Sequence, residues 1–160
     1  NKHIYKNIKH YENQDFQLFL QCGENNYAFI PKEIHKSKNI IIKKFINDMS
    51  IIYSAADLVI SRAGALAISE LCYMGKAMIL IPFKFAADNH QELNAAEIKN
   101  NNACIKINED ELKAGLLEKT IKKLFNNSNK INELENNSLR IAKSDATKDI
   151  IQNIVKVINA

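Results

Sequence analysis

A short run of small residues, Arg62-Ala63-Gly64-Ala65, lies where an apolar stretch gives way to a pattern typical of a helix. Backbone N–H groups at the start of a helix have no partner within it, and the helix dipole adds partial positive charge there. Such a position is suited to bind a phosphate or diphosphate. Gly64 either serves a sharp turn or lets the backbone approach a ligand closely, and the spacing alone leaves both explanations open.

Glu70 follows in the second turn of the same expected helix. It lies three or four residues after Leu66 and Ala67, and therefore on the same face as the helix start. A carboxylate beside a phosphate site can accept hydrogen bonds from paired ribose hydroxyls, as acidic residues do in dinucleotide sites. The alternatives are that Glu70 is an exposed surface residue or that it pairs with Arg62.

A third polar cluster, Asp88-Asn89-His90-Gln91, opens a later helix, after a strand that we expect to end at Pro82. Gln91 could hydrogen-bond sugar hydroxyls or a phosphate, and His90 could carry a proton. The alternative is that Asp88 caps the helix and that solvent hydrates the other side chains.

Other signatures of catalysis or cofactor binding are absent from the sequence. It contains no Walker pattern, GxGxxG, HxxH, HExxH or serine elbow, so a P-loop, a standard dinucleotide fold, a structural metal site and a Ser/His/Asp triad are not supported. We expect neither a cofactor nor a metal site. The three cysteines, Cys22, Cys72 and Cys104, are widely spaced among apolar residues. They are expected to be small core residues in a reducing compartment.

Short apolar runs alternate with helical patterns along most of the chain. Expected strands cover residues 16–22, 40–45, 57–61, 78–82 and 103–107. Expected helices cover residues 26–36, 49–55, 66–74, 89–99, 109–125, 129–143 and 146–158. This order predicts an α/β fold with a doubly wound parallel sheet, whose ligands bind beyond the carboxyl ends of the strands.

Composition sets further limits on function. The 160 residues carry a net charge of +4, but residues 51–105 hold four basic and five acidic side chains, which argues against a nucleic-acid partner. The basic excess elsewhere could help the protein lie on anionic lipid, although solvated helix faces are the favoured explanation. No signal peptide or membrane span is expected. Because the chain begins at Asn1 and not at Met, we expect a fragment of a longer protein.

Three segments together resemble the C-terminal domain of the MurG family. They are SRAGALAISEL, GK-x-x-ILIPF and ADNHQ-x-x-NA, spread over residues 61–95. These bacterial enzymes transfer N-acetylglucosamine from UDP-GlcNAc to lipid I, giving lipid II of peptidoglycan synthesis. The resemblance implies a Rossmann-like C-terminal half of a GT-B glycosyltransferase, with residues 1–160 as the UDP-sugar donor-binding domain.

The resemblance also implies roles for individual residues. The backbone of Ile46 matches the position that reads the uracil edge, and the helix start matches the diphosphate site. Glu70 matches the acid that binds the ribose hydroxyls, and Gln91 the amide that contacts the donor sugar. The full set of expected substrate-binding residues is Ile46, Ala65, Leu66, Ala67, Glu70 and Gln91, with Arg62, Gly64 and His90 in supporting roles. We expect no catalytic residue in this chain.

The sequence departs from the family pattern at a few positions. Ala67 stands where a threonine is common, which removes a hydroxyl contact, and Lys76-Ala77 replaces a pair ending in proline, which should loosen that turn. The family's glycine-rich loop and its N-terminal domain, with the proposed general base and the lipid I contacts, are expected upstream of Asn1.

The resemblance places the full protein peripherally on the cytoplasmic face of the bacterial inner membrane. Two alternatives remain open. One is another GT-B nucleotide-sugar enzyme, such as a glycolipid transferase or an epimerase. The other is a non-catalytic UDP-binding module.

Overall fold

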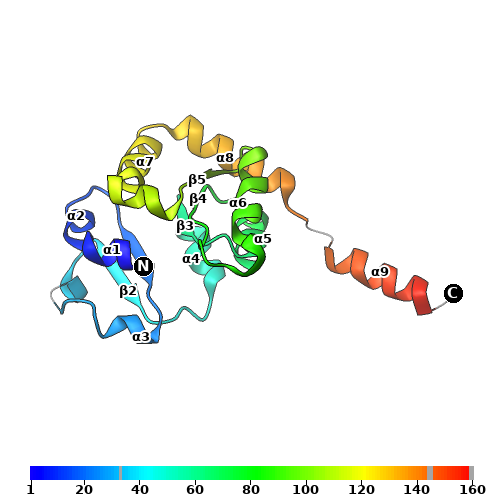
Figure 1. The fold of residues 1–160 in the computed structure, drawn as a ribbon, viewed down its shortest axis with the longest axis horizontal. Coiled ribbons are helices and arrows are strands. Elements are labelled where there is room, and N and C mark those ends of the chain that lie inside the picture. The colour runs from blue at the N-terminus through cyan, green and yellow to red at the C-terminus, as the bar shows by residue number, and fades with distance from the viewer. Residues whose placement is uncertain (33, 144–145, 159–160) are drawn as a thin grey trace. The chain divides into compact units, whose positions relative to one another are not determined.

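The computed structural model describes residues 1–32, 34–143 and 146–158. These residues form two compact units, Asn1–Ser50 and Ile51–Ala160 (Figure 1). No helix in the described ranges is long and apolar enough to cross a membrane.

The first unit is built on a pair of parallel strands. Strand β1 (Leu18–Gln21) pairs with β2 (Ile40–Lys43), with Leu18 opposite Ile40. The helical elements of this unit are α1 (Lys2–Lys6), α2 (Ile8–Glu12), α3 (Glu24–Tyr27) and the 3₁₀ turn η1 (Ile34–Lys36). Its buried side chains come from both kinds of element: Ile4, Ile8, Tyr11, Leu20, Cys22, Ile30, Ile34 and Ile40.

The helix expected over residues 26–36 is wrong. Only α3 and η1 are helical in that region of the described chain. Pro31 provides the physical reason, because proline has no N–H to donate and its ring disfavours a helical conformation in the residue before it. The short helices α1 and α2 were not expected from the sequence.

The second unit contains a three-stranded parallel sheet in the order β3–β4–β5. The strands are β3 (Val59–Ser61), β4 (Met78–Leu80) and β5 (Cys104–Lys106). The side chains of β4 are fully buried, at 0% exposure, because the middle strand has neighbours on both sides and is covered on both faces. The predicted parallel α/β fold is confirmed, and hydrogen bonding groups its strands into two sheets, one in each unit.

Helical elements alternate with these strands and follow the last of them along the chain (Figure 1). They are α4 (Met49–Ala55), α5 (Ala65–Tyr73), the 3₁₀ turn η2 (Ala87–Asn89), α6 (His90–Asn100), the 3₁₀ segment η3 (Glu109–Ala114), α7 (Leu116–Phe125), α8 (Ser128–Ile141) and α9 (Ala146–Ile158). The helix expected over 109–125 is therefore two elements. Gly115 separates them with a φ of 68°, a left-handed conformation that glycine adopts without strain.

Helix α8 is fixed to the sheet through one buried hydroxyl. Ser138 is fully buried and donates to the carbonyl oxygens of Lys76 and Ala103, at 3.0 and 3.2 Å. These two residues lie just before β4 and β5, so the hydroxyl connects α8 to the beginning of both strands. The turn that contains Lys76 is also held by the Lys76 side chain, which donates to the carbonyl oxygen of Ala56 at 3.0 Å.

The three cysteines are buried, as expected for small core residues. Cys104 lies on β5, and burial raises the pKa of its thiol to about 12. Burial also raises the pKa of Cys72 on α5. A thiol whose pKa is raised is protonated at neutral pH and is a poor nucleophile, so these cysteines are structural residues.

Candidate functional site

The start of α5 lies directly beyond the carboxyl end of β3. Its first intrahelical hydrogen bond runs from the Ile68 N–H to the Gly64 carbonyl oxygen, at 3.0 Å. The N–H groups of Ala65, Leu66 and Ala67 precede that bond, so they have no carbonyl one turn earlier to bind. The Leu66 side chain is 75% exposed, and this end of the helix is open to a ligand. These three N–H groups together can bind an anion.

The conformation of Gly64 decides between its two possible roles. Gly64 is the N-cap of α5 with φ −72° and ψ 140°, an extended conformation that any residue adopts. A Cβ atom built on Gly64 would meet nothing within 4 Å. The turn therefore does not require a glycine, whereas a ligand that approaches the helix start would benefit from the absent side chain.

Replacing Gly64 by serine provides a test of that role. Serine is a preferred N-cap, so Gly64→Ser should raise the free energy of unfolding by a few tenths of a kcal/mol up to about 1 kcal/mol. The serine oxygen would occupy one of the free N–H groups and the space in front of them. We therefore expect UDP to bind at least about fivefold more weakly, measured by calorimetry beside thermal unfolding. Unchanged binding in the stabilised variant would contradict a ligand at this helix start.

The Arg62 side chain holds several loops together. Its guanidinium donates to the carbonyl oxygens of Ile81 and Pro82, both at 3.2 Å, and pairs with the Glu109 carboxylate at 2.5 Å. The guanidinium also lies 5.4 Å from the centroid of the Phe83 ring. Arg62 thus connects the segments after β3, β4 and β5. The alternative in which Arg62 pairs with Glu70 is wrong, because the carboxylate partner of Arg62 is Glu109. The supporting role of Arg62 at the ligand site stays a prediction.

Glu70 lies on the exposed side of α5, one turn after the free N–H groups. Its Oε2 atom accepts a hydrogen bond from the hydroxyl of Tyr53 on α4, at 3.2 Å. The structure therefore differs from both alternatives, because Glu70 is exposed but has a specific partner. The remaining lone pairs of the carboxylate can accept further hydrogen bonds.

The loop before α6 has an unusual backbone. Asp88 and Asn89 both have positive φ angles, 48° and 54°, a conformation that asparagine and aspartate tolerate better than other residues with side chains. The expectation that Asp88 caps the helix is wrong, since the N-cap is Asn89 and no side-chain cap hydrogen bond is present. The chain thus enters α6 through two residues with left-handed backbone conformations and without a side-chain cap.

Gln91 and His90 stabilise this loop. The Gln91 Oε1 atom accepts a hydrogen bond from the Phe83 N–H at 3.0 Å, which leaves the Gln91 amide NH₂ as the group able to contact a ligand. The His90 Nδ1 atom lies 2.6 Å from the Ala87 carbonyl oxygen. Because a carbonyl only accepts, Nδ1 is the donor in this contact.

Ile46 lies in the first unit, while the other predicted residues lie in the second. The Ile46 N–H donates to the Gln21 side-chain oxygen at 2.9 Å. A side chain at the end of β1 thus fixes the backbone of Ile46.

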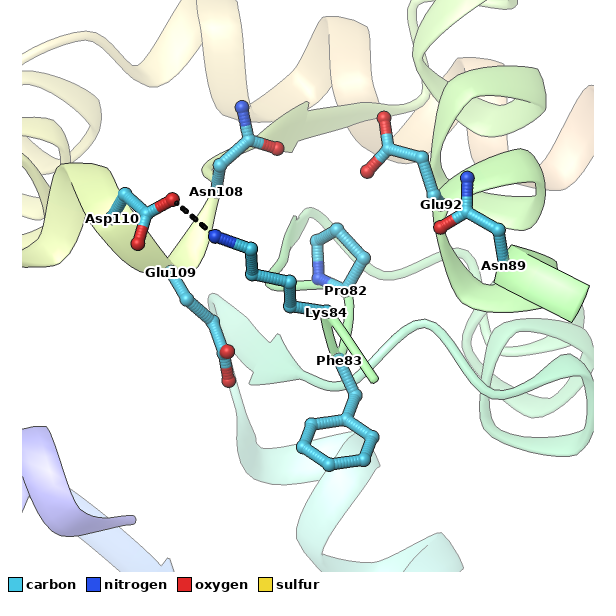
Figure 2. Close-up of a pocket in the computed structure, with 8 residues that line it drawn as sticks. All are labelled: Pro82, Phe83, Lys84, Asn89, Glu92, Asn108, Glu109 and Asp110. Carbon is cyan, nitrogen blue, oxygen red and sulfur yellow. Dashed lines mark hydrogen bonds and ion pairs between the residues drawn. The ribbon is translucent and has the colours of Figure 1, made fainter. Parts of the chain in front are cut away.

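Several residues at the site were missed by sequence reasoning. The Asn94 side chain of α6 donates to the Ala63 carbonyl oxygen at 3.0 Å, which holds the turn before α5. A pocket of about 320 Å³ lies beyond the ends of β4 and β5, and Figure 2 shows that the first turn of α6 faces η3 across it. Its lining residues are Pro82, Phe83, Lys84, Asn89, Glu92, Asn108, Glu109 and Asp110.

The charges of this pocket are largely paired. Lys84 contacts Asp110 at 3.0 Å, as Figure 2 shows, and Glu92 pairs with Lys106. The pocket does not include the free N–H groups of α5, Glu70 or Gln91. For the pocket residues that follow β4 and β5, the position after a strand was the only sequence signal. No group of three or more potential metal-binding side chains occurs among the residues with described positions.

The parallel strands, their crossover helices and the open helix start define a Rossmann-like α/β domain. Residues 1–154 match the glycosyltransferase family 28 C-terminal domain. The chain therefore belongs to that family.

Similar proteins carry the same enzyme name. The chain is 33% identical to a Finegoldia magna protein named "UDP-N-acetylglucosamine--N-acetylmuramyl-(pentapeptide) pyrophosphoryl-undecaprenol N-acetylglucosamine transferase", over 99% of this chain and 43% of that protein. A protein of the same name from Thermodesulfovibrio yellowstonii is 42% identical over 85% of this chain and 37% of its own length. The chain thus spans less than half of the relatives it matches.

Solved structures agree with the family assignment. The crystal structure of Acinetobacter baumannii MurG matches 97% of this chain and 46% of its own, with a TM-score of 0.81 and 26% identity. A glycosyltransferase of kitacinnamycin, at 18% identity and a TM-score of 0.64, shares the fold. The resemblance to the MurG family is confirmed, and so is the predicted fold of a GT-B C-terminal half.

Proposed function

We propose that this chain is the donor-binding domain of an enzyme that transfers N-acetylglucosamine from UDP-GlcNAc to lipid I. The names of the relatives support the reaction. The observation that carries the proposal is the open start of α5, with Glu70 one turn further along the same helix.

Each part of the donor has a candidate partner. The N–H groups of Ala65, Leu66 and Ala67 bind the diphosphate, and the Glu70 carboxylate accepts hydrogen bonds from the ribose hydroxyls. The Gln91 amide NH₂ contacts the donor sugar, and the Ile46 backbone contacts the uracil edge. The Phe83 N–H donates to Gln91 Oε1 and holds that side chain, while His90 Nδ1 contacts the Ala87 carbonyl oxygen in the same loop.

The chemical task of this domain is to stabilise the departing UDP. Negative charge develops on the diphosphate as the glycosidic bond breaks, and fixed backbone dipoles at a helix start stabilise that charge without having to reorganise. The transfer inverts the anomeric carbon by direct displacement. We assign the general base and the lipid I contacts to the part of the relatives that this chain does not cover.

The acceptor also determines where the enzyme works. Lipid I is a membrane lipid, so the full protein lies peripherally on the cytoplasmic face of the bacterial inner membrane. The basic excess of residues 106–160, ten basic against eight acidic side chains, is compatible with contact to anionic lipid.

The proposed reaction is tested by adding the part of the relatives that this chain does not cover. The N-terminal part of the Finegoldia magna relative is joined to this chain, and transfer from UDP-GlcNAc to a lipid I analogue is followed. We expect transfer by the joined protein and none by the 160-residue chain. Turnover by the chain alone would contradict the division of roles. A folded joined protein that binds UDP but transfers nothing would favour a non-catalytic UDP-binding module.

A further inference from the structure

A buried tyrosine behind Glu70 has no role in the function proposed above. Tyr53 lies on α4 and is 8% exposed, while Glu70 lies on the open side of α5. The Tyr53 hydroxyl donates to Glu70 Oε2 at 3.2 Å. Two helices that are separate in the sequence are thus joined at the carboxylate assigned to the ribose.

We propose that Tyr53 is a positioning residue that holds the Glu70 carboxylate in the orientation needed to accept hydrogen bonds from both ribose hydroxyls. The inference rests on the proposed function and adds to it a residue that need not touch the ligand.

The chemistry of the pair favours this role. An ionised carboxylate has about four acceptor positions, and Tyr53 occupies one of them on Oε2. Oε1 and the second lone pair of Oε2 remain for two hydroxyl donors, which matches a vicinal diol. A phenol donates and a carboxylate accepts, so the direction of the hydrogen bond is fixed.

The Tyr53 hydroxyl stays a donor over the whole physiological range. Burial raises its pKa to about 12, and the Glu70 carboxylate adds to the rise by repelling the phenolate charge and by accepting the hydrogen bond. Deprotonation therefore does not interrupt the contact near neutral pH.

Positioning matters because Glu70 is a long, exposed side chain. Fixing a free glutamate on binding costs side-chain entropy. Tyrosine has few rotatable bonds, and the ring of Tyr53 is packed in the protein interior. A carboxylate that is already held by such a donor loses less freedom when the ribose binds.

The test compares Tyr53→Phe with wild type in binding two probes, UDP and 2′,3′-dideoxy-UDP, by calorimetry on the 160-residue chain. The variant keeps the buried ring and loses only the hydroxyl. We expect UDP affinity to fall roughly two- to tenfold and dideoxy-UDP affinity to remain unchanged, because that probe has no hydroxyls for Glu70 to bind. Tyr73→Phe, an exposed tyrosine on α5, is the matched control and should bind both probes as wild type does.

A second comparison separates positioning from a purely structural effect. In a Glu70→Ala background, Tyr53→Phe should weaken UDP binding by less than twofold, because the side chain that Tyr53 orients is gone. Equal losses for both probes, or an unchanged affinity for UDP, would overturn the inference while leaving the proposed function intact. Wild-type protein that binds UDP and dideoxy-UDP equally would contradict the ribose role of Glu70 and, with it, this inference.

Discussion

Glu70→Gln is expected to lower the affinity of the chain for UDP by about 1–3 kcal/mol, which is roughly a 5- to 150-fold rise in Kd. Glutamine has the shape of glutamate, and its Oε1 atom can still accept from the Tyr53 hydroxyl. The variant therefore keeps the hydrogen bond to α4 and removes the charge that strengthens acceptance from ribose hydroxyls. Calorimetry with UDP measures the change.

The matched control is Glu97→Gln on α6, an exposed glutamate whose side chain and backbone carbonyl accept hydrogen bonds from Asn101. It makes the same change in net charge away from α5. We expect this control to bind UDP as wild type does, since exposed charges outside a site contribute little. Equal losses in both variants would show that net charge, and not the position of Glu70, determines affinity.

Gly75→Ala is expected to destabilise the protein by about 2–4 kcal/mol. Gly75 ends α5 with φ +61°, and a Cβ atom there would lie 2.6 Å from the Leu139 Cγ atom of α8. The substitution therefore adds backbone strain to a steric clash. Urea unfolding, followed by circular dichroism, measures the loss in the free energy of unfolding.

Two comparisons separate the backbone strain from the steric clash. Gly115→Ala has a similar φ, +68°, but its Cβ would meet only Glu118 at 4.0 Å, so it should lose only about 1–2 kcal/mol. Leu139→Ala should remove the clash. In a Leu139→Ala background, Gly75→Ala should therefore lower the free energy of unfolding by only about 1–2 kcal/mol, as Gly115→Ala does. If Gly75→Ala is no more destabilising than Gly115→Ala, the close packing of α8 against this turn is contradicted.

The strands could be predicted from the sequence because their signal is local. All five lie within the expected ranges, and each is a short apolar run followed by polar or small residues, as at Met78–Leu80. The helix start after Gly64 was also predictable, since small residues followed by a helical pattern indicate it. Asp48 is a preferred N-cap residue type just before α4, and its Oδ1 atom accepts a hydrogen bond from the Ser50 N–H at 3.0 Å.

Several contacts at the site could not be predicted because they join residues that are far apart in the sequence. Tyr53 precedes Glu70 by 17 residues and Asn94 follows Ala63 by 31, and no pattern pairs residues at such separations. Similarly, Arg62 has several acceptors within reach after folding, and only the fold selects Glu109 over Glu70.

The errors also have local causes. Asp88 is a good N-cap residue, but two consecutive left-handed residues move the cap to Asn89. The role of Ile46 came from the family resemblance, which also narrowed the role of Gln91 to the donor sugar. The structure shows that Gln21 holds the Ile46 backbone and that the Phe83 N–H holds the Gln91 side chain. The uracil and sugar contacts remain predictions.

We propose above that the start of α5 binds the diphosphate of a UDP-sugar. Amide NMR of the isotopically labelled chain, titrated with UDP up to millimolar concentrations, tests it most directly. We predict the largest shifts at the N–H groups of Ala65, Leu66 and Ala67, with those of α8 (Ser128–Ile141) unchanged. No shifts at α5, or larger shifts at Lys84 and Asp110 of the neighbouring pocket, would contradict the claim.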